Sequence, residues 1–160
     1  MGQALQQAQK AYQQDEVPIG AIIVKEKQIL GRGYNQRERL NDPTAHAEIL
    51  AITAAANTLS NWRLDDCVLY ITKEPCPMCA GAIVISRLKM VVFGCYDEEM
   101  GCCGSLYQLC GDPRLGQKIA VKGGIMEEKC LELIQDFFRT KRVKKKYLIN
   151  GQYEHCISCR

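Results

Sequence analysis

The sequence predicts a three-layer α/β domain in which helices cover a mixed sheet. Two observations favour this class. Strand-like apolar segments alternate with helical segments along the chain, and hydrophobic residues make up 47% and charged residues 24% of its 160 residues. This length and composition are typical of one globular domain with its own core, which excludes fibrous and disordered classes.

The first half of the chain contributes two helices and two strands. Residues 3–14 are rich in Ala and Gln and carry apolar side chains at helical spacing, which predicts a helix. Residues 17–25 and 29–34 are expected to form two strands separated by a turn. Residues 47–56 are rich in Ala, with Ile and Leu among them, which is typical of a helix.

The second half continues the alternation. We expect strands at 68–72, 90–95 and 119–121, and helices at 77–86, 106–110 and 125–141. The helix at 77–86 starts with a proline, which suits a first helical turn, and the helix at 125–141 is amphipathic. The sheet is therefore expected to have five strands.

Ten cysteines are present, fewer than a disulfide scaffold of this length would carry. No apolar stretch is long enough to cross a bilayer, and the first residues match neither a secretory leader nor a myristoylation signal. We therefore expect no membrane association and a cytoplasmic location. In such a reducing compartment, cysteines indicate metal binding or small buried apolar side chains.

The net charge of +3 is unevenly distributed. From Phe138 onward there are seven Lys and Arg residues and one acid, so the remainder of the chain is mildly acidic. A basic end of this kind suits a polyanionic partner. The alternative is a solvated helix end whose cations meet the helix dipole, and charge alone favours that alternative.

Two short segments carry the residues for metal chemistry, and each starts a predicted helix. Cys76 and Cys79 are three residues apart, so their sulfurs share one helix face, and the helix N-terminus favours the thiolate form that binds metal. His46 would be a third ligand. Two Cys and one His leave the fourth tetrahedral position open, which is the pattern of a catalytic zinc site.

Glu48 is the candidate for proton transfer. Two thiolates and a neutral imidazole make a zinc site nearly neutral, so a water molecule there is less acidic than at an all-His site and a nearby base helps more. Glu48 is two residues from His46, and inside a helix the two would point to opposite faces. The irregular geometry of a first turn is what would allow both to reach the metal.

Each motif alone has an ordinary alternative. A lone Cys-x-x-Cys is often redox-active or structural, and a lone His-x-Glu is usually a surface pair. Together, in this order and with Pro75 before the first Cys, they match the zinc deaminase signature H-x-E…P-C-x-x-C.

With these motifs, the segments 16–21, 41–49, 74–83, 91–94, 104–106 and 136–139 resemble the cytidine deaminase superfamily, and within it the bacterial tRNA adenosine deaminases. The resemblance implies a three-layer α/β/α cytidine-deaminase-like fold with a five-stranded mixed sheet and one Zn²⁺ per chain. It also implies hydrolytic deamination of adenosine to inosine at the wobble position of a tRNA anticodon loop, with the tRNA anticodon stem-loop as partner, and a homodimer. It covers residues 1–142, the expected deaminase domain, and leaves 143–160 as a basic C-terminal extension.

The resemblance also implies residue roles. His46, Cys76 and Cys79 would bind zinc, and Glu48 would shuttle protons. The other implied contacts are to the RNA: Asn35 to the flipped nucleoside, the backbone of Ala47 to the base edge, Asp97 near the anticodon backbone, and Phe138 and Arg139 from the C-terminal helix. Without the resemblance, Asn35 is equally a turn residue and Phe138 is a core residue.

Two functions remain as alternatives: deamination of a free nucleobase or nucleotide of the guanine or cytosine type, and a zinc-stabilised RNA-binding module without catalysis. The chain also departs from the family pattern. Lys73 stands where the family usually has Leu, which makes that wall of the site more polar. The terminal His155, Cys156 and Cys159 are either half of a second metal site or incidental residues of a chain end.

Overall fold

The computed structural model describes the backbone of residues 1–157 and the side chains of residues 1–143. Its centre is a five-stranded sheet in the order β2-β1-β3-β4-β5. The strands are β1 (Gly20–Lys25), β2 (Gln28–Tyr34), β3 (Val68–Lys73), β4 (Met90–Cys95) and β5 (Ala120–Lys122). β1 is antiparallel to both of its neighbours, whereas β3, β4 and β5 run parallel. The predicted mixed sheet is therefore confirmed.

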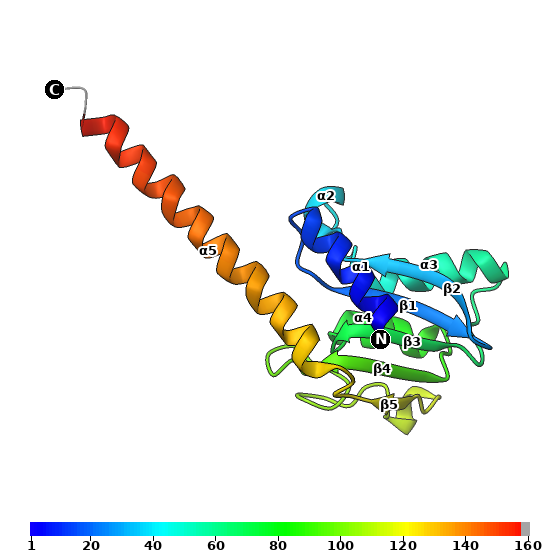
Figure 1. Cartoon of the computed structure of the whole chain (residues 1–160). Helices are drawn as coiled ribbons and strands as arrows, with labels where there is room; N and C mark the ends of the chain where they lie inside the picture. The colour runs from blue at the N-terminus through cyan, green and yellow to red at the C-terminus, as the bar shows by residue number, and fades with distance from the viewer. Residues whose placement is uncertain (158–160) are drawn as a thin grey trace.

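Helices cover both faces of this sheet (Figure 1). α1 (Gly2–Gln13) and α5 (Glu127–Ile157) contact each other on one face, and α3 (Ala47–Leu59) and α4 (Pro77–Ile85) contact each other on the other. The core between the sheet and the α3–α4 layer is built from apolar side chains, among them Ile23, Leu69, Ile71, Val91 and Phe93. These alternate strand positions face one side because strand side chains have a period of two.

Small residues set how closely α3 lies on the sheet. Gly31 and Gly33 of β2 lie directly under α3, and a Cβ on Gly33 would collide with the carbonyl oxygen of Ala47, as one on Gly31 would with that of Ala51. Three of the four buried residues of α3 are alanines, namely Ala47, Ala51 and Ala55. The main chain of β2 therefore lies almost in contact with the main chain of α3. Because of this close contact, the first turn of α3 is held at a fixed position relative to β2.

The carboxyl ends of β3 and β4 and the start of α4 lie at one edge of the sheet. β3 and β4 are parallel, so their carboxyl ends lie at the same edge, and the connection from β3 leads directly into α4. The open edge at the carboxyl ends of parallel strands is where α/β proteins usually bind ligands. The residues of both predicted metal-binding segments are found there.

The structure corrects several sequence-based boundaries. Residues 106–110 were predicted to be a helix and instead form turns, because the amides of Leu106 and Leu109 donate backward to Gly101 and Cys102. The short α2 (Arg37–Leu40) and the 3-10 turn η1 (Pro113–Leu115) were not predicted. The first strand pairs only from Gly20, three residues later than expected.

The last helix is longer than the sequence pattern indicated. α5 continues past residue 141 to Ile157 and projects away from the sheet (Figure 1), so it crosses the predicted boundary at residue 142 without a break. The side chains of the terminal His155, Cys156 and Cys159 lie outside the described residues. In the described part of the chain, no helix combines the length and apolar character that a bilayer span requires.

Candidate active site

The three predicted metal ligands come from the starts of two helices. His46 is the N-cap of α3 and Cys76 the N-cap of α4, both with extended backbone, while Cys79 lies in the first turn of α4. Pro77 at the first position of α4 has no N–H to satisfy and suits this start. The positive ends of both helix dipoles therefore meet where the sulfurs lie, which favours thiolate.

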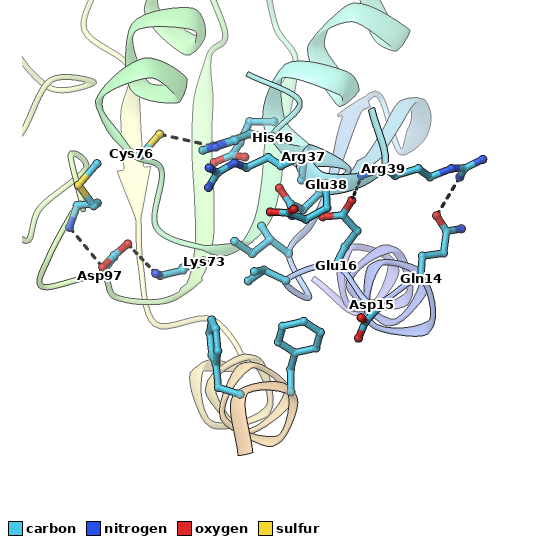
Figure 2. Close-up of a pocket in the computed structure, with 18 of the residues that line it drawn as sticks. Gln14, Asp15, Glu16, Arg37, Glu38, Arg39, His46, Lys73, Cys76 and Asp97 are labelled. Atoms are coloured by element: carbon cyan, nitrogen blue, oxygen red, sulfur yellow. Dashed lines mark hydrogen bonds and ion pairs between the residues drawn. The ribbon is translucent and has the colours of Figure 1, made fainter. Parts of the chain in front are cut away.

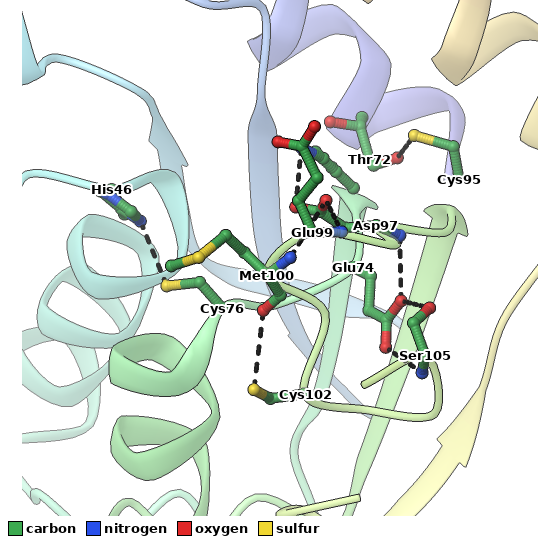
Figure 3. Close-up of polar contacts among 11 residues, drawn as sticks. His46, Thr72, Glu74, Cys76, Cys95, Asp97, Glu99, Met100, Cys102 and Ser105 are labelled. Carbon is green, nitrogen blue, oxygen red and sulfur yellow. Dashed lines mark hydrogen bonds and ion pairs between the residues drawn. The ribbon is translucent and has the colours of Figure 1, made fainter. Parts of the chain in front are cut away.

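The spacing of the three donor atoms fits a metal ion. His46 Nδ1 lies 3.7 Å from Cys76 Sγ and 3.5 Å from Cys79 Sγ, and the three atoms all lie within 4.8 Å of one another. Tetrahedral zinc with ordinary bond lengths would place sulfur and nitrogen ligands about 3.5 Å apart. Figure 3 shows the His46 ring directed at the Cys76 sulfur. The set can therefore hold a metal without rearrangement.

Hydrogen bonds among these three side chains give the two thiols different pKa values. Hydrogen bonding to Cys79, and then to His46, lowers the pKa of Cys76 to about 4. The pKa of Cys79 is raised, first by its interaction with Cys76 and then by burial. The hydrogen bond to Cys76 raises the pKa of His46. The two sulfurs are therefore not equivalent, and the Cys76 thiol is the more acidic of the pair.

Glu48 is the second residue of α3 and lies next to this set. Its side chain is buried, and burial is the main cause that raises its pKa to about 7, with the nearby Cys76 acting in the same direction. The extended backbone of His46 breaks the helical periodicity, so Glu48 and His46 both line one cavity. A carboxyl group with such a pKa can take and return a proton near neutral pH.

This cavity has a volume of about 1260 Å³ (Figure 2). Asn35, Ala47, Asp97 and Phe138 line it, so the structure brings four of the five predicted RNA-contacting residues to one place. The fifth, Arg139, is not among the lining residues and pairs with Asp136 on its own helix.

The aromatic wall of the cavity comes from α5. Phe137 is buried and meets Tyr12 of α1 edge to face, whereas Phe138 is 43% exposed and is a wall residue rather than a core residue. The Tyr12 hydroxyl donates to Asp136 at 2.7 Å, and Lys141 pairs with Asp15. These contacts hold α5 against the end of α1.

Asp97 is held by its own chain. Its Oδ2 pairs with Lys73 Nζ at 2.7 Å, and its Oδ1 accepts from the amides of Glu99 and Met100. Lys73 lines the cavity and is about one third exposed. The departure from the family pattern at this position thus places an ammonium group beside the Asp97 carboxylate (Figure 2).

Glu74 ties this loop to the metal-binding segment. Its carboxylate accepts hydrogen bonds from the Asp97 amide and from the amide and hydroxyl of Ser105 (Figure 3). It also accepts from the Cys103 amide. Burial opposes the charged form, but these hydrogen bonds outweigh it and hold the pKa of Glu74 below its ordinary value. Since Glu74 is only two residues before Cys76, the loop and the ligand share one anchor.

Sequence reasoning missed Glu74 and Glu16 as functional candidates. Both are buried, with 3% and 1% of their surface exposed. Both also stand in segments that carried the family resemblance, directly before the sequences Pro75-Cys76 and Val17-Pro18. Their place directly before these two segments is the only signal that the sequence offered, because other polar residues precede both acids.

The fold and this constellation define a deaminase of the cytidine-deaminase-like fold. A model of the MafB19-like deaminases matches residues 1–142. A Bacillus subtilis (strain 168) protein named tRNA-specific adenosine deaminase is 45% identical over 146 residues, 91% of this chain and 91% of that protein. The chain therefore belongs to the family that the MafB19-like deaminase model describes, and its curated relatives place it among the tRNA-specific adenosine deaminases.

Solved structures agree with this placement. One from studies of A-to-I editing by tRNA:A34 deaminases at the wobble position of transfer RNA gives a TM-score of 0.78 at 38% identity, over 81% of this chain and 94% of that chain. A guanine deaminase from Bacillus subtilis gives a TM-score of 0.57 at 42% identity, over 59% of this chain and 61% of that chain. The similarity to the tRNA deaminase is therefore the more extensive.

Proposed function

We propose that this protein converts adenosine to inosine at the wobble position of a tRNA anticodon loop, with water consumed and ammonia released. The observation that carries the proposal is the His46, Cys76 and Cys79 set beside the buried Glu48 at one cavity. Relatives that are similar over nearly the whole chain carry the name of this activity.

His46, Cys76 and Cys79 would hold one Zn²⁺ per chain. Zinc in this environment supplies an activated water molecule for attack on C6 of the base. Glu48 would take one proton of that water and pass it to N1 of the purine, and would then carry the remaining proton, from the new C6 hydroxyl, to the amino group that leaves as ammonia. Its burial matches this task because a carboxyl with a pKa near 7 exchanges protons in both directions at neutral pH.

The remaining cavity residues would hold the nucleoside and its neighbours. Asn35 contacts the flipped nucleoside and the backbone of Ala47 reads the base edge. Asp97, Phe138 and Arg139 contact the flanking RNA, with the exposed ring of Phe138 offering a stacking surface. A cavity of about 1260 Å³ exceeds the roughly 300–1,000 Å³ of ordinary small-molecule pockets and has room for more than one nucleotide.

Two assembly features belong to the same proposal. We infer a homodimer in which both chains hold the RNA from the family resemblance of the sequence, and a cytoplasmic location from the tRNA substrate. The basic residues after Phe138 would contact tRNA phosphates.

The second candidate is deamination of a free guanine or cytosine compound, since a guanine deaminase shares the fold over part of the chain. The two are separated by inosine formation on a tRNA anticodon hairpin, measured beside free adenosine, guanine and cytidine, with zinc content determined on the same sample. Conversion of the hairpin alone supports the proposal, and conversion of a free base alone overturns it. Zinc binding without any conversion would indicate the non-catalytic RNA-binding module.

A further inference from the structure

Glu16 is a buried acid of the cavity wall that the proposed chemistry does not use. Its side chain is 1% exposed and lies between α1 and the segment that leads to α2. Oε2 accepts from Asn35 Nδ2 at 3.0 Å, and Oε1 accepts from the Arg39 amide at 2.8 Å. Each oxygen therefore has one donor, and both donors belong to the wall of the nucleoside site.

The contact with Glu16 determines how the Asn35 amide can point. A carboxamide has an acceptor end and a donor end, and only the donor end can face a carboxylate. The Asn35 main chain is fixed as well, because its amide donates to the Ile19 carbonyl at 3.0 Å. Rotation of the amide by half a turn would set two oxygens against each other in a buried place, which is costly.

The other end of the Asn35 amide is what the cavity receives. Among the side chains that the structure describes, none donates to Asn35 Oδ1, and no enclosed polar atom is left without a partner. Asn35 lines the cavity and is 5% exposed, so Oδ1 is open to the cavity and not to the outer surface. Asn35 therefore presents its acceptor, Oδ1, to a ligand in the cavity, while its donor, Nδ2, faces Glu16.

We propose that Glu16 is a positioning residue that fixes the orientation of the Asn35 amide and so decides which hydrogen-bonding edge the nucleoside meets. This inference rests on the proposed function for the identity of the ligand. In this proposal Glu16 does not touch the substrate. It affects the reaction only through the orientation of Asn35.

The test is Glu16→Gln. Gln has nearly the same shape and keeps one acceptor for the Arg39 amide, but it turns an NH₂ group toward Asn35 Nδ2, and two donors cannot pair. Asn35 must then rotate and present the opposite edge. We expect kcat/KM for inosine formation on an anticodon hairpin to fall roughly tenfold to hundredfold, with zinc content unchanged.

A second background separates positioning from a general structural role. In an Asn35→Ala protein, Glu16→Gln should change kcat/KM by less than about twofold, because the group through which Glu16 acts is gone. An equal loss in both backgrounds would overturn the proposal, as would no loss in the parent background. Glu26→Gln, in the β1–β2 turn, is the control for removing one negative charge.

Thermal unfolding tests the contact without any activity. Asn35→Asp places two carboxylates face to face and should lower the unfolding temperature. Adding Glu16→Gln should raise it again, because the Gln NH₂ can donate to the new carboxylate. A double variant no more stable than Asn35→Asp alone would overturn the contact. A parent protein that leaves the hairpin unconverted refutes the proposed function instead, while this stability comparison still decides the contact.

Discussion

Replacing Glu74 by Gln should separate the 97–105 loop from the metal-binding segment. Oε1 of Glu74 accepts from the amides of Cys103 and Ser105 at 2.9 and 3.0 Å, and Oε2 accepts from the Asp97 amide at 3.0 Å and from the Ser105 hydroxyl. A Gln side chain keeps one oxygen. If that oxygen serves Cys103 and Ser105, the new NH₂ group faces the Asp97 amide.

The expected magnitude follows from this count of donors. The Ser105 hydroxyl can turn and accept from the NH₂ group, but the Asp97 amide is a donor facing a donor and loses its bond. One buried donor left unpaired costs about 1–3 kcal/mol, and the remaining bonds lose the extra strength of a charged acceptor. We expect a loss of about 2–4 kcal/mol, or roughly 5–15 °C in unfolding temperature for a chain of this size.

The measurement is thermal unfolding of the zinc-loaded parent and variant, with Glu98→Gln as control. Glu98 is exposed in the same loop and should change stability by no more than about 0.5 kcal/mol. Equal unfolding temperatures for the parent and Glu74→Gln would refute the anchoring role.

The pH dependence of the unfolding stability is a second test of the role of Glu74. Because its folded pKa lies below the ordinary value of 4.5, its stabilisation is present above that value and is lost as the pH falls through the folded pKa. The stability difference between parent and Glu74→Gln should therefore stay constant from pH 7 down to about pH 5 and shrink as the pH falls below 4.5. A constant difference would contradict the charged hydrogen bonds as its source.

Three further predictions concern the proposed reaction and its RNA. Glu48→Ala should lower deamination by at least about 10²–10⁴ while zinc stays near one per chain; loss of zinc with activity would make Glu48 a ligand. Lys73→Leu removes the cation beside the Asp97 carboxylate and should weaken tRNA binding by about threefold to tenfold, because the carboxylate then repels the RNA phosphates. Adding Asp97→Asn should restore binding, and unchanged binding in Lys73→Leu would show that the ammonium contributes nothing. Changing the lysines at 144–146 to Gln should lower the logarithmic salt slope of tRNA binding by roughly 0.7–0.9 per lost phosphate contact, and an unchanged slope would leave these lysines only solvated.

The sheet and its major helices were predictable because local patterns determine them. β3 and β4 are short apolar runs, and α3 and α4 start at residues whose types suit helix starts, so each could be located from neighbouring residues alone. The close approach of His46, Cys76 and Cys79 was expected from their order and spacing, and the structure brings them together.

The loops could not be predicted in this way because distant residues organise them. Residues 106–110 have helix-forming composition, yet the loop before them is fixed by Glu74, about thirty positions away along the chain. Phe137 and Phe138 both line the cavity, and periodicity alone cannot say which ring is buried against Tyr12 of α1 and which is exposed. Glu16 and Asn35 meet only once the sheet has formed.

The two glycines of β2 have a consequence for protein engineering. Libraries aimed at this enzyme would normally spare the cavity residues and vary the strands freely. Any side chain at Gly33 would push back the carbonyl of Ala47, which lies between His46 and Glu48 in the chain. Such a variant could keep its sheet and still place its proton carrier wrongly. In a mutational scan, Gly31 and Gly33 should therefore be as intolerant as the residues of the cavity, although neither of them lines it.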